Sequence, residues 1–201
     1  VELCRDLIRI DTSNYGDGSG PGEAEAAEYV VSRLREVGLE PQTYESEPGR
    51  VTVAVRIPGA DRERGALCVH GHLDVVPAQA SDWEVDPFGA ELRDGCIWGR
   101  GAVDMKGMDA MILAVARHLA RTGEVPPRDL VLVFFADEEA GGVHGSQFMA
   151  KNHPEVFDGV TEAVSEVGGY SVTVPGADGG QTRAYLLQTA EKGIAWLRLR
   201  A

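Results

Sequence analysis

The sequence predicts an α/β fold, a mostly parallel mixed sheet with helices on both faces. Apolar runs of strand length alternate with segments of helical periodicity, an order typical of sheets with a substantial parallel component. Residues 130–136 are apolar throughout, as expected for a strand buried on both faces. The chain has 201 residues, of which 43% are hydrophobic, so it has enough apolar material for one sizeable core.

Four helices are predicted. The first passes through Leu3, Leu7 and Ile8, and the second covers residues 23–37 and ends at Gly38, because glycine is a favourable C-cap. The third covers residues 104–121 and ends at Gly123. Its apolar residues recur at helical spacing; they are Met108, Met111, Ile112, Val115 and Leu119. A short fourth helix is expected near residues 146–152.

The predicted strands are β-rich runs between these helices. They cover residues 51–57, 66–69 and 130–136, and a further strand leads into Ser165. A last alternating run covers residues 194–200. The chain begins at Val1 without a methionine and stops inside this run, so we expect it to be a piece of a longer protein.

Charge and cysteine usage exclude several classes of function. The 19 Lys and Arg residues against 32 Asp and Glu residues give a net charge of −13, which disfavours nucleic acid and membrane surfaces as partners. Three cysteines without a CxxC pair argue against a thiolate zinc site and a disulfide framework. Neither a leader nor a run of 18 apolar residues is visible. We therefore predict a cytoplasmic protein.

The glycine-rich loops and the absence of certain motifs argue against a nucleotide-binding protein and a serine hydrolase. The loop at residues 16–22 precedes a helix, but no strand comes before it and no Gly-Lys-Ser/Thr follows, so we interpret it as a surface loop rather than a phosphate site. The chain has no GxGxxG or Walker motif for a nucleotide-binding protein and no GxSxG for a serine hydrolase.

Ionisable residues lie at the ends of two predicted elements, after a strand and at the start of a helix. Chemistry in open α/β sheets gathers outside the carboxyl ends of strands. His72 and Asp74 come just after the strand at residues 66–69 and point to one side if the chain stays extended. A carboxylate on the second ring nitrogen would fix the tautomer of a metal-binding histidine. Asp104 opens the third helix, where it serves as an N-cap, a metal ligand, or both.

Three carboxylates end the apolar run at residues 130–136: Asp137, Glu138 and Glu139. At the end of a buried strand, ionised carboxylates cost free energy unless a positive charge lies close to them. Because adjacent strand residues face opposite ways, one of the two glutamates could hold a metal while the other acts as a general base. The alternative is a polar turn leaving the sheet.

Glu166 follows another short apolar run and, taken alone, reads as a solvated acid. Together with the residues above it completes an oxygen-rich set with one imidazole: His72, Asp104, Glu139 and Glu166. This mixture suits Zn²⁺ and also accepts Mn²⁺ or Co²⁺.

Six segments carry a resemblance to a known family. They are HGHLDVVP (70–77), WEVDPF (83–88), GRGAVDMKG (99–107), DEEAGGVHG (137–145), SE (165–166) and AEKG (190–193). In this order the chain resembles the di-zinc metallohydrolases that include aminoacylase, glutamate carboxypeptidase and succinyl-diaminopimelate desuccinylase. The resemblance implies a zinc-exopeptidase-like catalytic domain with two Zn²⁺ ions in the complete site.

The resemblance also implies a role for each site residue. Asp104 would bridge the two metals, and His72 and Glu166 would complete the first. Glu139 would belong to the second metal. Glu138 would be the general base, and Asp74 would orient His72.

The implied function is metal-dependent hydrolysis of an amide bond in N-acyl amino acids or short peptides, through a metal-bridging water and a Glu general base. Residues 1–190 would form the N-terminal part of the catalytic domain, and residues 191–201 would begin a lid domain through which a homodimer could form. The family's second-metal histidine and oxyanion histidine would lie outside this chain. His118, His144 and His153 are in the wrong segments to replace them, so we interpret them as surface or packing residues.

The isolated chain is therefore expected to be largely inactive. The competing hypothesis is a non-catalytic binding or scaffold fragment on the same fold. Bound metal without turnover would favour that alternative.

Overall fold

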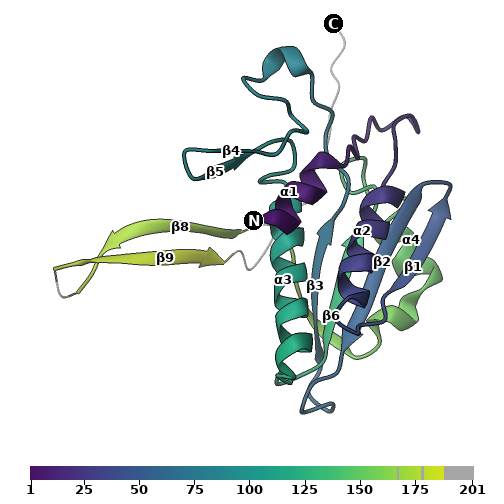
Figure 1. Ribbon diagram of the computed structural model, residues 1–201. Helices are drawn as coiled ribbons and strands as arrows, with labels where there is room; N and C mark the ends of the chain where they lie inside the picture. Colours follow the sequence, from purple (N-terminus) through teal and green to yellow (C-terminus); the bar gives the residue numbers. More distant parts are fainter. Residues whose placement is uncertain (167, 178, 188–201) are drawn as a thin grey trace, which may run out of the picture. The chain divides into compact units, whose positions relative to one another are not determined.

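The computed structural model describes residues 1–166, 168–177 and 179–187. The chain divides into two units, Val1–Ser165 and Glu166–Ala201. The first unit contains a five-stranded sheet with the order β1-β2-β6-β3-β7 (Figure 1). Its strands are β1 (Gln42–Glu47), β2 (Arg50–Ile57), β3 (Ala66–His72), β6 (Leu130–Phe135) and β7 (Val160–Val164).

The sheet is mixed, as predicted. β3 runs parallel to both β6 and β7, whereas β2 is antiparallel to β1 and β6. Parallel strands end at the same edge of a sheet. The register pairs His72, the last residue of β3, with Phe135, the last residue of β6. The segments that follow β3 and β6 therefore start side by side.

Helices cover both faces of the sheet (Figure 1), which confirms the predicted layers. α1 (Glu2–Arg9), α2 (Ala24–Arg35) and α3 (Lys106–Thr122) share one apolar cluster with β2 and β6. α4 (Ser146–Asn152) and the 3₁₀ turn η2 (Pro154–Phe157) lie against the other face.

β6 is buried on both faces, as its sequence predicts. Leu132 and Phe134 belong to the cluster with α1, α2 and α3. Val131, Val133 and Phe135 point the other way, into the cluster with α4. A strand that contributes to both clusters requires apolar side chains at every position, and this explains the uninterrupted run.

A glycine follows each of the two helices α2 and α3, and one of them is the helix C-cap. Gly38 and Gly123 have φ values of +80° and +71°. Their backbone N–H groups donate to the Arg35 and Leu119 carbonyls, respectively. Gly123 is the C-cap of α3 as predicted. The C-cap of α2 is Glu36, in the right-handed conformation, so Gly38 is not the cap itself but lies two residues beyond it, where the left-handed backbone favours glycine.

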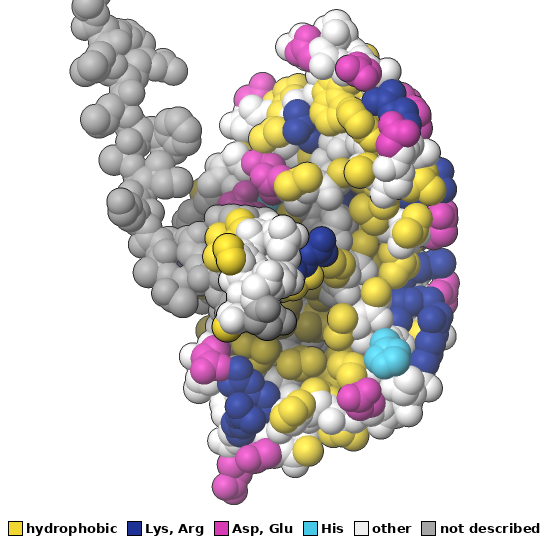
Figure 2. All heavy atoms as spheres, turned by 90° about the vertical axis from the view of Figure 1, so that its left-hand side faces the viewer, with side chains coloured by type: hydrophobic (Ala, Val, Ile, Leu, Met, Phe, Trp, Pro, Cys, Tyr) yellow, Lys and Arg dark blue, Asp and Glu magenta, His cyan; other side chains and the backbone are white. Residues whose placement is uncertain are grey.

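The strand β1 and the apolar stripe of α3 depart from the sequence prediction. β1 was not predicted because its residues are mostly polar; it forms an edge strand, and Tyr44 is its contribution to the apolar cluster on that face. The apolar stripe of α3 is also split, since Met111 and Val115 are 62% and 56% exposed. Smaller residues of α3, such as Ala110 and Ala116, take buried positions instead. Figure 2 shows apolar side chains interspersed with charged ones on the face that it draws.

The remaining elements are small. The 3₁₀ turn η1 (Ala80–Asp82) precedes a hairpin of β4 (Glu91–Arg93) and β5 (Cys96–Trp98), and the second unit contains a hairpin of β8 (Gly168–Pro175) and β9 (Gln181–Leu187). None of the helices in the described part of the chain has the length and apolar character needed to cross a membrane. The strand predicted at 194–200 and the boundary predicted at residue 190 lie outside the described residues.

A buried lysine anchors the start of α3. Lys106 is fully buried, and its Nζ donates a hydrogen bond of 2.6 Å to the Ile10 carbonyl. Burial lowers the pKa of Lys106 to about 8, and the fully buried Asp109 opposes this shift. Lys106 therefore ties the chain after α1 to the first turn of α3, next to Asp104.

We expect Lys106→Met to destabilise the fold by about 3–5 kcal/mol, because it removes the positive charge that faces the buried Asp109 carboxylate. Lys151→Met, at an exposed position of α4, should change stability by no more than about 0.5 kcal/mol. Urea unfolding of both variants measures the difference. Equal stability of the two variants would contradict a role for Lys106 as an anchor.

Candidate metal centre

His72 ends β3 with its side chain 2% exposed. Its Nδ1 lies 2.9 Å from the Asp74 carbonyl oxygen and 3.4 Å from the Asp74 carboxylate. A carbonyl oxygen only accepts hydrogen bonds, so this contact assigns the proton of a neutral imidazole to Nδ1. The lone pair of Nε2 then faces the other way.

Carboxylates surround Nε2. The Asp104 Oδ1 lies 3.0 Å away and the Glu138 Oε2 lies 3.7 Å away. His72, Asp104 and Glu139 each offer one potential ligand atom, and these three atoms all lie within 4.8 Å of one another. One imidazole nitrogen with carboxylate oxygens is a donor set suited to Zn²⁺ and related divalent cations. The residues present therefore fit the metal that the sequence predicts.

Asp104 does not cap α3, and the N-cap interpretation is wrong. The helix begins at Lys106, and the N-cap position, Met105, has no side-chain cap hydrogen bond. The Asp104 side chain is 64% exposed and contacts His72 instead. Asp104 lies before the cap position, and its carboxylate is oriented toward the imidazole.

The fully buried carboxylate of Asp74 joins the two strand ends. It accepts the backbone N–H groups of Glu138 and Glu139, each at 3.0 Å, and the Nδ2 group of Asn14 at 2.9 Å. Burial alone would raise the pKa of Asp74, but hydrogen bonds from His72, Asn14 and the Glu138 backbone outweigh it and lower the pKa. Asp74 thus contacts both His72 and the turn that carries the two glutamates.

Glu138 and Glu139 do not alternate across a strand, contrary to the sequence prediction. β6 ends at Phe135, and the glutamates lie in the turn that follows. Because both backbone N–H groups bind one carboxylate, both residues are held at the same strand end as His72. Burial and the negative charge of Asp104 raise the pKa of Glu139 to about 7, an effect that a bound cation would reverse.

A buried polar network behind this turn was missed by the sequence analysis. Asn14 donates to Asp74 and also to Asp137 at 3.0 Å, and it accepts from the Arg50 Nη2 at 3.2 Å. Arg50 pairs with the fully buried Glu23 at 2.6 Å. Polar residues so far apart in sequence carry no local signal. The one local indication of a buried Glu23 is its position just before a helix with buried alanines.

Asp137 is the strained residue of the turn. Its φ is +60°, a conformation that Asp adopts more readily than most residues but still uncommonly. Its carboxylate accepts hydrogen bonds from Asn14 and from the His144 backbone N–H at 2.9 Å. Behind it, a Cβ on Gly145 would lie 1.7 Å from the Ala136 carbonyl oxygen, so this position of the predicted motif requires glycine.

The other predicted residues are placed as follows. Glu166 is the first residue of the second unit and comes two residues after β7, and its role as a ligand stays a prediction. The side chains of His118, His144 and His153 are 65%, 33% and 31% exposed. His153 also packs its ring on Tyr44 and Phe148, as expected for a packing residue.

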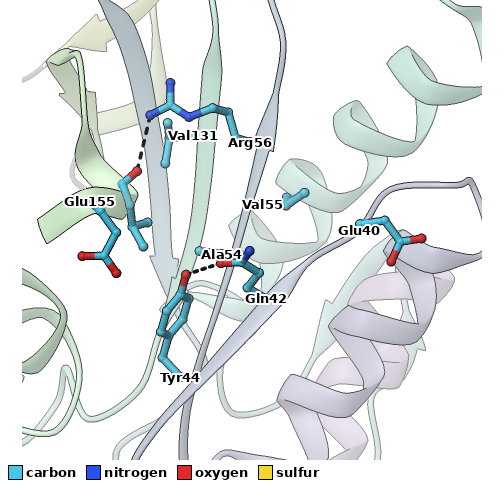
Figure 3. Close-up of a pocket in the computed structure, with 9 residues that line it drawn as sticks. Glu40, Gln42, Tyr44, Ala54, Val55, Arg56, Val131 and Glu155 are labelled. Carbon is cyan, nitrogen blue, oxygen red and sulfur yellow. Dashed lines mark hydrogen bonds between the residues drawn. The ribbon is translucent and has the colours of Figure 1, made fainter. Parts of the chain in front are cut away.

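A pocket of about 320 Å³ lies elsewhere, beside β1, β2 and η2 (Figure 3). Tyr44 donates to Gln42 there, and Arg56 donates to the Val156 carbonyl. Neither His72 nor the carboxylates around it line this pocket. The chemistry of the strand ends, rather than this pocket, identifies the candidate site.

Comparison with known proteins identifies the family of this chain. The model of peptidase family M20/M25/M40 matches residues 68–181, more than half of the chain. The chain belongs to peptidase family M20/M25/M40. The match includes His72, Asp104, Glu138 and Glu139, and the resemblance predicted from the six motif segments is confirmed.

Members of the M20/M25/M40 family are similar over about three quarters of this chain. Aminoacylase-1 of Sus scrofa is 35% identical over 152 residues, which are 75% of this chain and 36% of that protein. Succinyl-diaminopimelate desuccinylase of Rhodospirillum centenum is 38% identical over 150 residues, 73% of this chain and 37% of that protein. The chain thus spans little more than a third of the relatives it matches.

Solved structures of the M20 family confirm the fold. Human carnosine dipeptidase 1 has a TM-score of 0.68 and 23% identity, covering 82% of this chain and 37% of its own. The M20 metallo-carboxypeptidase Sso-CP2 of Sulfolobus solfataricus has the same TM-score and identity, covering 82% of this chain and 36% of its own. At this identity the likeness concerns the fold.

The network behind the metal centre predicts a pH-dependent stability. Burial, with a smaller effect of Asp74, raises the pKa of Glu23 from 4.5 to about 7 although Arg50 opposes the shift. A raised folded-state pKa stabilises the fold below the unfolded pKa, and this stabilisation is lost as pH rises through the folded value.

Between about pH 4.5 and pH 7, wild type should therefore lose up to roughly 3 kcal/mol of stability relative to Glu23→Gln, which cannot ionise. Urea unfolding of both metal-free proteins across this interval measures the loss. A constant difference between the two proteins at all pH values would show that Glu23 does not titrate in this range.

Proposed function

We propose that this chain forms the N-terminal part of the catalytic domain of a metal-dependent amide hydrolase acting on N-acyl amino acids or short peptides. The observation that carries the proposal is that two carboxylates approach the His72 Nε2, Asp104 at 3.0 Å and Glu138 at 3.7 Å. Membership of a peptidase family and similarity to aminoacylase-1 and succinyl-diaminopimelate desuccinylase support it.

Four residues would hold two zinc ions. His72, Asp104 and Glu166 would bind the first, and Asp104 and Glu139 would bind the second. A divalent cation bound here would lower the pKa of a coordinated water and polarise the scissile carbonyl. The remaining chemistry belongs to the protein's own side chains.

Glu138 is the proposed general base. Its side chain is 48% exposed and faces the same ring nitrogen as the metal ligands, so it can reach both water and the cation site. It would take a proton from the attacking water and pass it to the leaving amine. Asp74 would keep His72 in the tautomer with the proton on Nδ1, as the contacts of Nδ1 favour.

The proposal extends to domain organisation. Residues 1–190 would belong to the catalytic domain, and residues 191–201 would begin a lid and dimerisation domain. The complete enzyme would also contain that lid and a C-terminal segment. The C-terminal segment would supply the histidine that completes the coordination of the second metal. Substrate selection would then depend largely on residues outside this chain.

Zinc titration tests the ligand set on this chain by itself. We expect one tight site and at most one weak site, because three protein ligands are a workable set for zinc and two carboxylates are not. His72→Ala should abolish the tight site, whereas His118→Ala, at a 65% exposed position, should leave it unchanged. Calorimetry measures both. Two equally tight sites would show that a residue of this chain replaces the missing histidine.

The roles of the adjacent glutamates separate in the complete enzyme. Glu138→Gln should retain zinc but lose about 10²–10⁴-fold in kcat, because it removes the general base. Glu139→Gln should lower zinc content first and activity as a consequence. Metal analysis with a hydrolysis assay on N-acyl amino acids distinguishes them. The reverse pattern would exchange the two roles, and bound zinc without any turnover would favour a binding or scaffold protein.

A further inference from the structure

We propose that Asn14 is a positioning residue of the metal centre. Its side-chain amide holds the carboxylates of Asp74 and Asp137 together and thereby fixes the turn that carries Glu138 and Glu139. The inference rests on the proposed function, because it concerns the same set of metal ligands. It adds a residue from a different part of the chain, which none of the motif segments contains.

The contacts of the Asn14 amide match its chemistry on both ends. Its Nδ2 group donates to Asp74 at 2.9 Å and to Asp137 at 3.0 Å. Its Oδ1 accepts from the Gly16 backbone N–H at 3.0 Å and from Arg50 at 3.2 Å. Backbone N–H and guanidinium groups only donate, and ionised carboxylates only accept. Asn14 therefore has one orientation, with both N–H bonds directed at the carboxylates.

The two carboxylates need this bridge because both are buried, at 0% and 3% exposure. Like charges repel strongly where water is excluded, and an ionised carboxylate out of water needs donors. A side-chain amide supplies one proton to each carboxylate, whereas a hydroxyl has one proton in total and a carboxylate has none. Asparagine thus fits a position between two acids.

The two hydrogen bonds of the Asn14 amide act on the Glu138 backbone through two acids, Asp74 and Asp137. Asp74 accepts the backbone N–H groups of Glu138 and Glu139. Asp137 precedes Glu138 and holds a φ of +60°, a conformation that persists only where contacts over-determine it. Asn14 binds both acids, so its loss would release the backbone of the turn at two points. The distance from Glu138 to His72 would then vary.

The Asn14 side chain is not needed to hold its own segment in place. The Asn14 backbone N–H donates to the Val75 carbonyl at 2.9 Å, and Val75 donates to the Thr12 carbonyl at 3.2 Å. The Thr12 hydroxyl also donates to the Leu73 carbonyl at 2.7 Å. These bonds pair residues 12–14 with the segment that follows β3. The Asn14 Oδ1 adds its bonds from Gly16 and Arg50, and the separate contribution of the Nδ2 group is therefore its hold on the two carboxylates.

Binding of Co²⁺ and Zn²⁺ to this chain tests the inference. Asn14→Asp keeps the size of the side chain but removes both donors and adds a third negative charge. We expect about 10–100-fold weaker zinc binding, the range typical for groups that orient metal ligands, and a changed visible spectrum of bound Co²⁺, which reports ligand geometry. Asn14→Ser, with one donor proton, should fall between wild type and Asn14→Asp.

Two controls separate positioning from stability. Asn152→Asp makes the same chemical change at an exposed site of α4 and should bind metal as wild type does. Thr12→Val removes a buried hydrogen bond of the same segment without touching either carboxylate, so it should lower the melting temperature but keep the Co²⁺ spectrum. If Asn14→Asp does not fold, Asn14→Ser carries the test.

The outcomes are distinct. A folded Asn14 variant with wild-type zinc affinity and an unchanged Co²⁺ spectrum overturns the inference while the proposed function stands. A wild-type chain that binds neither metal overturns both. Weakened binding together with an altered spectrum in the Asn14 variants, but not in Thr12→Val, supports the role of Asn14 as a positioning residue.

Discussion

The buried carboxylate of Asp74 is the constraint on which the candidate metal centre depends. A carboxylate removed from water must be compensated by donors. Asp74 takes them from two distant segments, the Asn14 amide and the backbone N–H groups of Glu138 and Glu139, and from the nearby imidazole of His72. Satisfying one buried charge therefore brings together the chain after β3, the turn after β6 and the segment before α2. The positions of His72, Glu138 and Glu139 relative to one another follow from that requirement.

The sheet makes this convergence feasible. β3 and β6 are parallel neighbours whose last residues, His72 and Phe135, lie in register. The chain leaving each strand therefore emerges at the same edge, within reach of a single side chain. Had these two strands been antiparallel, their following loops would lie at opposite edges. The sheet topology thus places the segments after β3 and β6 at one end of the sheet, and the hydrogen bonds of Asp74 hold these two segments together.

Sequence patterns identified most of this arrangement because the signals are local. Apolar runs mark strands such as β6, glycine marks the end of α3, and the ionisable residues lie shortly after a strand or just before a helix. The rest depends on contacts across the chain. Asn14 is 60 residues from Asp74 and 123 from Asp137, so no spacing rule connects them. The edge strand β1 carries too few apolar side chains to be recognised, and the turn after Phe135 ends the alternation that a continuing strand would give to Glu138 and Glu139.

The acids of the site divide by exposure, and this division matches two different physical tasks. Asp74, Asp137 and Glu23 are at most 3% exposed, and each is held by fixed donors, so these acids form the scaffold. Asp104 and Glu138 are 64% and 48% exposed, and both face the His72 Nε2 from the solvent side. An acid that must exchange protons or bind an ion needs access to water, whereas an acid that fixes geometry benefits from burial. A cation and a substrate would therefore arrive at the Nε2 of His72, where Asp104 and Glu138 are exposed, whereas the buried acids on the Nδ1 side keep the imidazole and the turn in position.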